Sequence, residues 1–169
     1  TETGSYNDDQ WTFHEQNSSE EAFLEVKRIF SQLLEVAQTE GVYVAIEPAY
    51  HHVISSPKRL RRLMDELAHD HIRVTFDLFN LLSIHNYKNQ RAIIDEMIEL
   101  FRQDIRIIHT KDFIIENGEL KQVAPGQGLL DYAYLLERLK ELPTEPIMIF
   151  EGVVGDDIVK SAAFLKTFN

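Results

Sequence analysis

Four side chains in this sequence are placed where they could bind a metal ion and move protons. Each is the first strongly polar residue after a short apolar run: Glu47, Asp77, His109 and Glu151. They are separated by 30, 32 and 42 residues, about one strand plus one helix per step. Two glutamates, an aspartate and a histidine form a hard, oxygen-rich ligand set. These residue types predict a site for one divalent metal ion: Mn2+, Mg2+, Co2+ or Zn2+.

A single carboxylate after a strand is more often a helix cap or a salt-bridge partner than a metal ligand. A single histidine after two isoleucines is likewise usually structural. Four such residues at equivalent positions of consecutive units are far less frequent by chance, and this favours the metal site.

The elements that must position these residues alternate between strands and helices. The apolar runs are short and rich in β-branched or aromatic residues, which predicts buried strands over residues 42–46, 72–76, 105–108 and 146–150. Apolar residues at intervals of three and four predict amphipathic helices over 60–67, 94–101 and 132–139. A further stripe predicts a helix before the first strand: Phe23, Val26, Phe30, Leu33 and Ala37.

Helix start signals agree with these positions. Ser18 with Glu21 has the spacing of a capping box, in which the two side chains satisfy free N–H groups. Ser56 followed by Pro57 is typical of an N-cap and the first helical position. A last helix is expected to begin near residues 156–157, where two aspartates favour a helix N-terminus.

Alternating helices and apolar strands predict a parallel sheet, either doubly wound or a TIM barrel. A doubly wound nucleotide-binding sheet should carry a glycine-rich turn after its first strand, and no strand here is followed by one. The segment Gly126–Gly128 lies far from a strand end and is expected to be a flexible loop. We therefore predict an α/β fold, a TIM (β/α)8 barrel. A full barrel needs about 250 residues, so residues 1–169 would be four to five βα units of one domain. All four polar residues would then lie on one rim.

Composition narrows the possible partners. The 17 basic and 28 acidic residues give a net charge of −11, which opposes binding to nucleic acid. The chain has no cysteine, so a disulfide framework or a thiol nucleophile is excluded. No apolar run approaches the length of a membrane span and no leader is evident, so we expect a cytoplasmic protein that does not bind membranes.

The segments around the four polar residues resemble the xylose isomerase-like TIM barrels, in particular the sugar phosphate isomerase/epimerase proteins. The resemblance is carried by four segments: Ala45–Pro48, Thr75–Asn80, Ile108–Phe113 and Ile149–Glu151. Thr1–Ser5 resembles the exit of the fourth strand of such a barrel. Pro125–Gly128 with Asp131 and Tyr132 resembles the connection between its last two strands. The resemblance implies that residues 1–169 are the C-terminal portion of the barrel domain.

The resemblance also implies a metal-dependent isomerase or epimerase of carbohydrate metabolism, acting on a sugar, a sugar phosphate or a related keto-polyol. Glu47, Asp77, His109 and Glu151 would bind one divalent metal ion, whose charge stabilises a developing enediolate. Glu47 and Glu151 would be the catalytic acid/base pair on opposite sides of the substrate. Their order of action is left open, and a homo-oligomer is compatible with the sequence.

Three further residues are candidates for substrate binding. Lys111 could contact a substrate oxygen or phosphate, or instead pair with Asp112 or another carboxylate. Asn80 lies three residues after Asp77, where many relatives carry histidine, and could contact substrate or cap a loop. His52 is a rim candidate or else a surface histidine. Trp11 and His14, in the first long loop, could form a wall of the pocket, but the sequence favours exposed loop residues with no fixed role.

Two other functions compete with this interpretation. The apurinic endonucleases of the same superfamily bind several zinc ions. They have the pattern Asp-x-x-His, with a histidine at the position where this chain has Asn80, three residues after Asp77. No Asp-x-His pair follows His109, and the negative charge opposes a DNA surface. The other alternative is a non-catalytic sugar-binding barrel, which would not need both glutamates.

Overall fold

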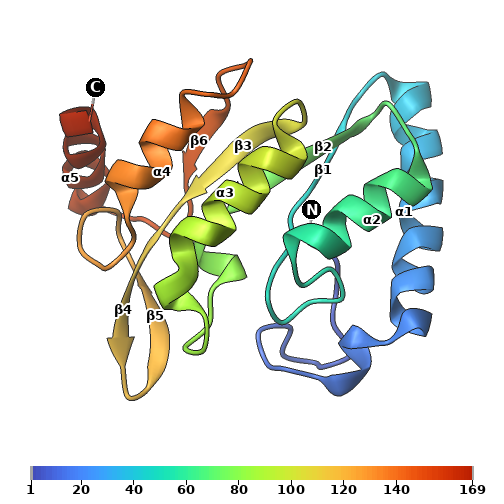
Figure 1. Cartoon of the computed structure of the whole chain (residues 1–169), viewed down its shortest axis with the longest axis horizontal. Helices are drawn as coiled ribbons and strands as arrows, with labels where there is room; N and C mark the ends of the chain where they lie inside the picture. The colour runs from blue at the N-terminus through green and yellow to red at the C-terminus, as the bar shows by residue number, and fades with distance from the viewer. Residues whose placement is uncertain (1, 169) are drawn as a thin grey trace.

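Four parallel strands form the sheet that carries the predicted ligands (Figure 1). The computed structural model describes residues 2–168, so Thr1 of the opening segment and Asn169 lie outside the described residues. The strands of this sheet are β1 (Val44–Ile46), β2 (Ile72–Asp77), β3 (Ile105–Thr110) and β6 (Ile147–Phe150). The helices are α1 (Glu20–Glu40), α2 (Pro57–Leu67), α3 (Gln90–Phe101), α4 (Tyr132–Leu139) and α5 (Asp156–Leu165). Short 3-10 turns are η1 (Glu15–Ser18), η2 (Phe79–Leu81), η3 (Tyr87–Asn89) and η4 (Lys166–Phe168).

The strands lie in the sheet in their chain order, β1-β2-β3-β6. Consecutive helices pack side by side, α1 against α2, α2 against α3, and α3 against α4. A doubly wound sheet reverses its strand order at a switch point, whereas a (β/α)8 barrel does not. The prediction of a partial TIM barrel is therefore confirmed, with a sheet of four strands in place of eight.

The core fills the space between the sheet and the helices. Phe76 of β2 and Ile108 of β3 are buried against the apolar faces of α2 and α3. On α1 the buried stripe continues from Phe30 through Leu34, which is 1% exposed. The predicted stripe was wrong at Leu33, which is 45% exposed, because Leu34 lies four residues after Phe30 and nearer the centre of the buried face.

One of the two predicted helix caps is confirmed. Ser56 precedes α2 and its hydroxyl accepts a hydrogen bond from the Arg59 N–H, with Pro57 at the first helical position. The prediction for Ser18 was wrong by one residue. Ser18 belongs to η1, which displaces the start of α1, and the hydroxyl of Ser19 accepts the bond from Ala22.

Both outer strands of the sheet are more exposed than predicted. Ile147 of β6 is 68% exposed and Ile149 is 41% exposed, so the prediction of a fully buried last strand was wrong. Val42 and Tyr43 were predicted to belong to the first strand, but β1 begins at Val44 and both side chains are more than half exposed. The reason is common to both ends: β1 and β6 each have one strand neighbour among the described residues.

A hairpin of β4 (Asp112–Glu116) and β5 (Glu119–Val123) follows β3, and the sequence analysis did not predict it. Its turn is Asn117-Gly118, with φ of 53° and 83°. Positive φ at both turn residues is typical of tight hairpins and explains the Asn-Gly pair. In Figure 1 the hairpin projects from the same end of the sheet as the N-terminal loop. No helix within residues 2–168 has the length and apolar content of a membrane span.

Candidate metal centre

The carboxyl ends of the four parallel strands bring the four predicted ligands into one cluster. Asp77 is the last residue of β2 and pairs with His109 of β3, while His109 pairs with Ile149, two residues before Glu151. Glu47 follows directly after β1. One ligand atom from each of these four residues lies within 4.8 Å of the others. The strand ends therefore converge as expected for a parallel sheet.

The imidazole of His109 is surrounded by the three carboxylates. Its Nδ1 lies 2.6 Å from Glu151 Oε2, 3.4 Å from Glu47 Oε2 and 3.5 Å from Asp77 Oδ2. Contacts with Asp77 and Glu47 raise the pKa of His109 to about 10, against the opposing effect of burial. In the metal-free protein at neutral pH, His109 is therefore protonated.

The donor atoms fit a divalent cation. Asp77 Oδ2, His109 Nδ1 and Glu151 Oε2 are buried and face one another, yet none of them makes a hydrogen bond of good geometry. Their close neighbours are ionic: His109 Nδ1 lies beside Glu151 Oε2, and the Lys111 ammonium lies beside Asp77 Oδ2 and Glu151 Oε2. These donor atoms, which converge on one point, are held together by charge and could be held by a cation instead. Carboxylate oxygens and a neutral imidazole are suitable ligands for Mg2+, Mn2+, Co2+ or Zn2+.

Asn80 and Lys111 connect the cluster into one polar network. The Asn80 amide donates to Glu47 Oε1 at 2.7 Å, and its backbone N–H donates to Asp77 Oδ1 at 3.0 Å. The Lys111 ammonium donates to Asn80 Oδ1 at 3.1 Å and lies 2.9 Å from Asp77 Oδ2 and 3.0 Å from Glu151 Oε2. Burial alone would lower the pKa of Lys111, but the carboxylates of Asp77 and Glu151 outweigh it and raise that pKa.

Of the ion pairs considered from the sequence, Lys111 forms those with other carboxylates, Asp77 and Glu151. The carboxylate of Asp112 does not pair with Lys111. It instead accepts hydrogen bonds from four backbone N–H groups, at 2.8 to 3.0 Å: Phe113, Gly126, Gly128 and Leu130. The loop around Gly126–Gly128 is thus tied to the start of β4, which was not expected of a flexible loop. A Cβ on Gly128 would lie 2.2 Å from the Phe113 carbonyl oxygen, so only glycine fits there.

A cavity of about 780 Å³ opens beside the cluster, at the carboxyl end of the sheet. Glu151, Lys111 and Asn80 line it on the cluster side. The loop before α1 contributes Trp11, which the sequence left open between a pocket wall and an exposed loop residue. The remaining lining residues are Asp9, Thr12, Phe13, Tyr50, His51, Phe79, Leu82, Ser83, Ile84, His85, Glu119, Leu120 and Gln122.

His52 and His14 occupy other positions. His52 is 1% exposed and packs under Trp11, with ring centroids 5.1 Å apart, while the neighbouring His51 lines the cavity. His14 caps η1 by accepting from the Gln16 N–H and does not line the cavity. The structure thus brings Asn80 and Lys111 to the cluster and the cavity, but it leaves His52 behind the cavity wall.

Several lining residues were missed from the sequence. Phe79 lies directly before Asn80 in η2, and Tyr50 and His51 follow Glu47 by three and four residues, so their nearness to a strand end was a usable signal. Glu119 and Gln122 lie on β5, and only recognition of the Asn-Gly hairpin turn could have placed them. Gln122 also donates to the Glu151 carbonyl at 2.7 Å, which ties the hairpin to the end of β6.

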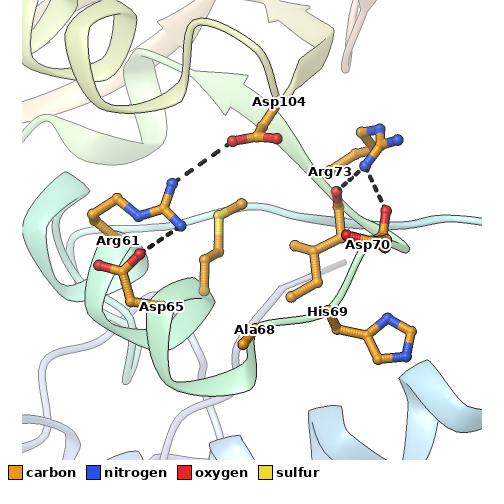
Figure 2. Close-up of a pocket in the computed structure, with 9 residues that line it drawn as sticks. Arg61, Asp65, Ala68, His69, Asp70, Arg73 and Asp104 are labelled. Carbon is orange, nitrogen blue, oxygen red and sulfur yellow. Dashed lines mark hydrogen bonds and ion pairs between the residues drawn. The ribbon is translucent and has the colours of Figure 1, made fainter.

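A second cavity, of about 490 Å³, lies at the amino ends of the strands, where β2 begins (Figure 2). Its arginines are paired with the surrounding chain. Arg61 lies 2.8 Å from Asp65 and 3.7 Å from Asp104, and Arg73 donates to the Asp70 carbonyl at 2.8 Å (Figure 2). Because barrel active sites lie at the carboxyl ends of the strands, these pairs are best explained by stability.

Comparison with known proteins agrees with the fold. The profile of the family described as "Xylose isomerase-like TIM barrel" matches residues 4–168. An uncharacterized protein of Methanocaldococcus jannaschii is 23% identical over 142 residues, which cover 82% of this chain and 46% of the relative. The crystal structure of a D-tagatose 3-epimerase-like protein has a TM-score of 0.73 and 20% identity, over 92% of this chain and 58% of that one.

A third match is the crystal structure of a xylose isomerase-like TIM barrel protein from Mycobacterium smegmatis in complex with magnesium. Its TM-score is 0.67 at 15% identity, over 94% of this chain and 54% of that one. The chain thus spans about half the length of the relatives it matches. Because the family profile covers nearly all of the sequence, the chain belongs to the xylose isomerase-like TIM barrel family.

Proposed function

We propose that this protein is a divalent-metal-dependent isomerase or epimerase of a sugar, a sugar phosphate or a related keto-polyol, and that residues 1–169 are the C-terminal portion of its barrel. The observation that carries the proposal is the pair of glutamates. Glu47 and Glu151 come from β1 and β6, the two outer strands of the sheet, yet a carboxylate oxygen of each lies within the same 4.8 Å cluster. Two carboxylates converging from opposite ends of a sheet can act on opposite sides of one substrate.

Glu47, Asp77, His109 and Glu151 would hold the cation. When bound, a divalent cation polarises the carbonyl and neighbouring hydroxyl oxygens of a substrate and makes the intervening C–H more acidic. The magnesium complex of the Mycobacterium smegmatis relative and the name of the D-tagatose 3-epimerase-like relative support this proposal.

The proton transfers are assigned to the two glutamates. One carboxylate removes the proton from the carbon next to the carbonyl, and the C–H electron pair becomes the C=C bond of an enediolate. For an epimerase, the other glutamate returns a proton to the opposite face of the same carbon, and the carbonyl forms again. For an isomerase, a proton is returned to the former carbonyl carbon, and the proton of the neighbouring hydroxyl passes to the former carbonyl oxygen. Atoms and electrons balance without an oxidant or a reductant.

Neighbouring residues hold these glutamates in place. Glu47 is 5% exposed, and its Oε1 accepts from Asn80, so its orientation is set from within the protein. Glu151 is more exposed and faces the cavity beside the Lys111 ammonium. We assign Asn80 and Lys111 to the orientation of these carboxylates at the substrate cavity. His52 would support the cavity from behind through Trp11.

The apurinic endonuclease alternative receives little support. Among residues 2–168, one group of His, Asp and Glu side chains is close enough together to bind a metal ion. An enzyme with several zinc ions would need further ligands near that group.

The test combines metal analysis with a screen of free ketoses. We expect about one divalent ion per chain and conversion of at least one ketose, with exchange of the transferred hydrogen for deuterium from D2O. Glu151→Gln should reduce turnover by about 10²-fold or more while the unfolding temperature is retained. The matched control is Glu99→Gln, on the exposed face of α3. Undiminished turnover in Glu151→Gln would refute the acid/base assignment, and about three zinc ions per chain would favour the endonuclease.

A further inference from the structure

We infer that residues 5–14 form a lid over the cavity, which neutral His52 holds closed and which opens when this imidazole is protonated. The role of the lid as a control of catalysis rests on the proposed function, but its movement does not. The loop lies directly before η1, and four of its residues line the cavity: Asp9, Trp11, Thr12 and Phe13. Movement of the loop therefore changes one wall of the cavity.

The two ends of the loop are fixed to the rest of the chain by Asn17, which is buried. Its side-chain oxygen accepts a hydrogen bond from the Tyr6 N–H at 2.9 Å. Its amide donates to Ser5 Oγ at 2.8 Å and to the His51 carbonyl at 2.7 Å. The rings of Tyr6 and His14 also stack, with centroids 6.0 Å apart. The loop thus has its two ends close together, as in a compact Ω-loop.

Between these ends the loop is held together by its own polar groups. The Asp9 carboxylate accepts from the Trp11 N–H at 3.1 Å and from the Thr12 hydroxyl at 2.8 Å. In the described part of the chain, the hydrogen bonds of good geometry that residues 7–13 make all end on residues 5–12. The middle of the loop can therefore leave the cavity without breaking such a bond to the rest of the chain, while its base stays in place.

The closed loop lies on the buried ring of His52. This ring is 1% exposed and packs against Trp11, with centroids 5.1 Å apart. Neither of its nitrogens makes a hydrogen bond of good geometry with the described residues. A proton added to this ring places a charge where it has little hydration, which costs free energy. The charged ring regains hydration when the loop above it moves away, so protonation favours the open loop.

The groups around His52 set the direction of the pH dependence. Burial is the largest effect and lowers the pKa of His52 from its ordinary value. The carboxylates of Glu2 and Glu47 act in the opposite sense, as does the Gln10 carbonyl, whereas a charge on His51 acts with burial. The closed loop is therefore fully favoured above the ordinary histidine pKa of about 6.5. Below that pH, the ratio of closed to open loop falls about tenfold per pH unit until the lowered pKa is reached.

The test follows the fluorescence of Trp11, the only tryptophan of the chain, in excess Mg2+. Quenching by acrylamide measures how accessible the indole is to solvent, and Trp11 is 43% exposed in the closed loop. Between about pH 7.5 and about pH 5.5 we expect the quenching constant to rise about twofold and the emission to move to longer wavelength. A quenching constant that stays the same over this range overturns the inference. The assay needs no substrate, so a lid that opens without conversion of any ketose would refute the proposed function alone.

Two neighbouring histidines separate the cause from other effects of acid. In His52→Gln, and in His52→Phe, which keeps an aromatic ring under Trp11, the quenching constant should no longer depend on pH. The matched control is His51→Gln, which should keep the dependence, because protonated His51 attracts the Asp9 carboxylate of the loop and so opposes opening. Release of Mg2+ at low pH would act in all of these variants alike. A full pH dependence in both His52 variants therefore overturns the inference.

Discussion

Binding of a divalent cation should displace one proton from His109. In the metal-free protein, the imidazole is protonated because Asp77, Glu47 and Glu151 surround it, and these carboxylates raise its pKa to about 10. A histidine can bind a metal ion only in its neutral form. The cation must therefore take over the electrostatic role of the imidazolium proton.

The size of the effect follows from the pKa. At pH 7.5, a group with a pKa of about 10 is more than about 99% protonated, so each bound ion should release about one proton. The apparent metal affinity should rise about tenfold per pH unit up to about pH 10 and level off above it. With an ordinary histidine pKa near 6.5, proton release at pH 7.5 would be about 0.1 per ion.

Titration calorimetry in two buffers of different ionisation enthalpy, for example phosphate and Tris, measures the number of protons released. We expect about one per Mg2+ in the natural protein, and about none together with weaker binding in His109→Gln. The matched control is His69→Gln, at the opposite edge of the sheet, which should behave like the natural protein (Figure 2). Proton release near zero in the natural protein would refute the assignment of His109 as a ligand that is protonated before metal binds.

Three further substitutions test the structure around the cluster. Asp112→Asn can keep only part of the four hydrogen bonds that this carboxylate accepts from backbone N–H groups. The change should therefore destabilise the protein by about 3 kcal/mol and lower the Tm by about 6–12 °C. Calorimetry measures the Tm, and Glu116→Gln is the control. Gly128→Ala should also lower the Tm, because its Cβ would lie 2.2 Å from the Phe113 carbonyl oxygen; an unchanged Tm would contradict this close approach. Asn80→Ala removes a hydrogen bond that orients a ligand carboxylate, and it should weaken Mg2+ binding about tenfold by titration with little change in Tm.

The two outer strands of the sheet mark the places where the four-stranded sheet of residues 2–168 differs from a closed barrel. β1 and β6 are the outer strands of the sheet among residues 2–168, and Ile147 and Ile149 on β6 are exposed. The edge of an outer strand can pair with a further strand. The position of β1 and β6 at the two sides of the sheet therefore accounts for the residues of both predicted strands that are more exposed than expected.

Several features could be predicted because they depend on local sequence. Apolar runs of strand length, followed at once by Glu47, Asp77, His109 and Glu151, are visible without any long-range information. Parallel strands then bring their carboxyl ends to one edge whatever the details of packing, which explains why the four residues converge. The helix start at Ser56-Pro57 is local in the same way, because the Ser56 hydroxyl accepts its hydrogen bond from Arg59, only three residues further along the chain.

Other features were decided only by tertiary contacts. Which of His51 and His52 faces the cavity depends on Trp11, about forty residues earlier in the chain. The partners of Lys111 come from β2, η2 and the end of β6, so no local pattern could show that Asp112 is not one of them. The sequence by itself thus determined the barrel units and the cluster at their ends, because both follow from strand periodicity. The tertiary structure decided the charge, walls and partners of the cavity, because these depend on which distant loops meet above the sheet.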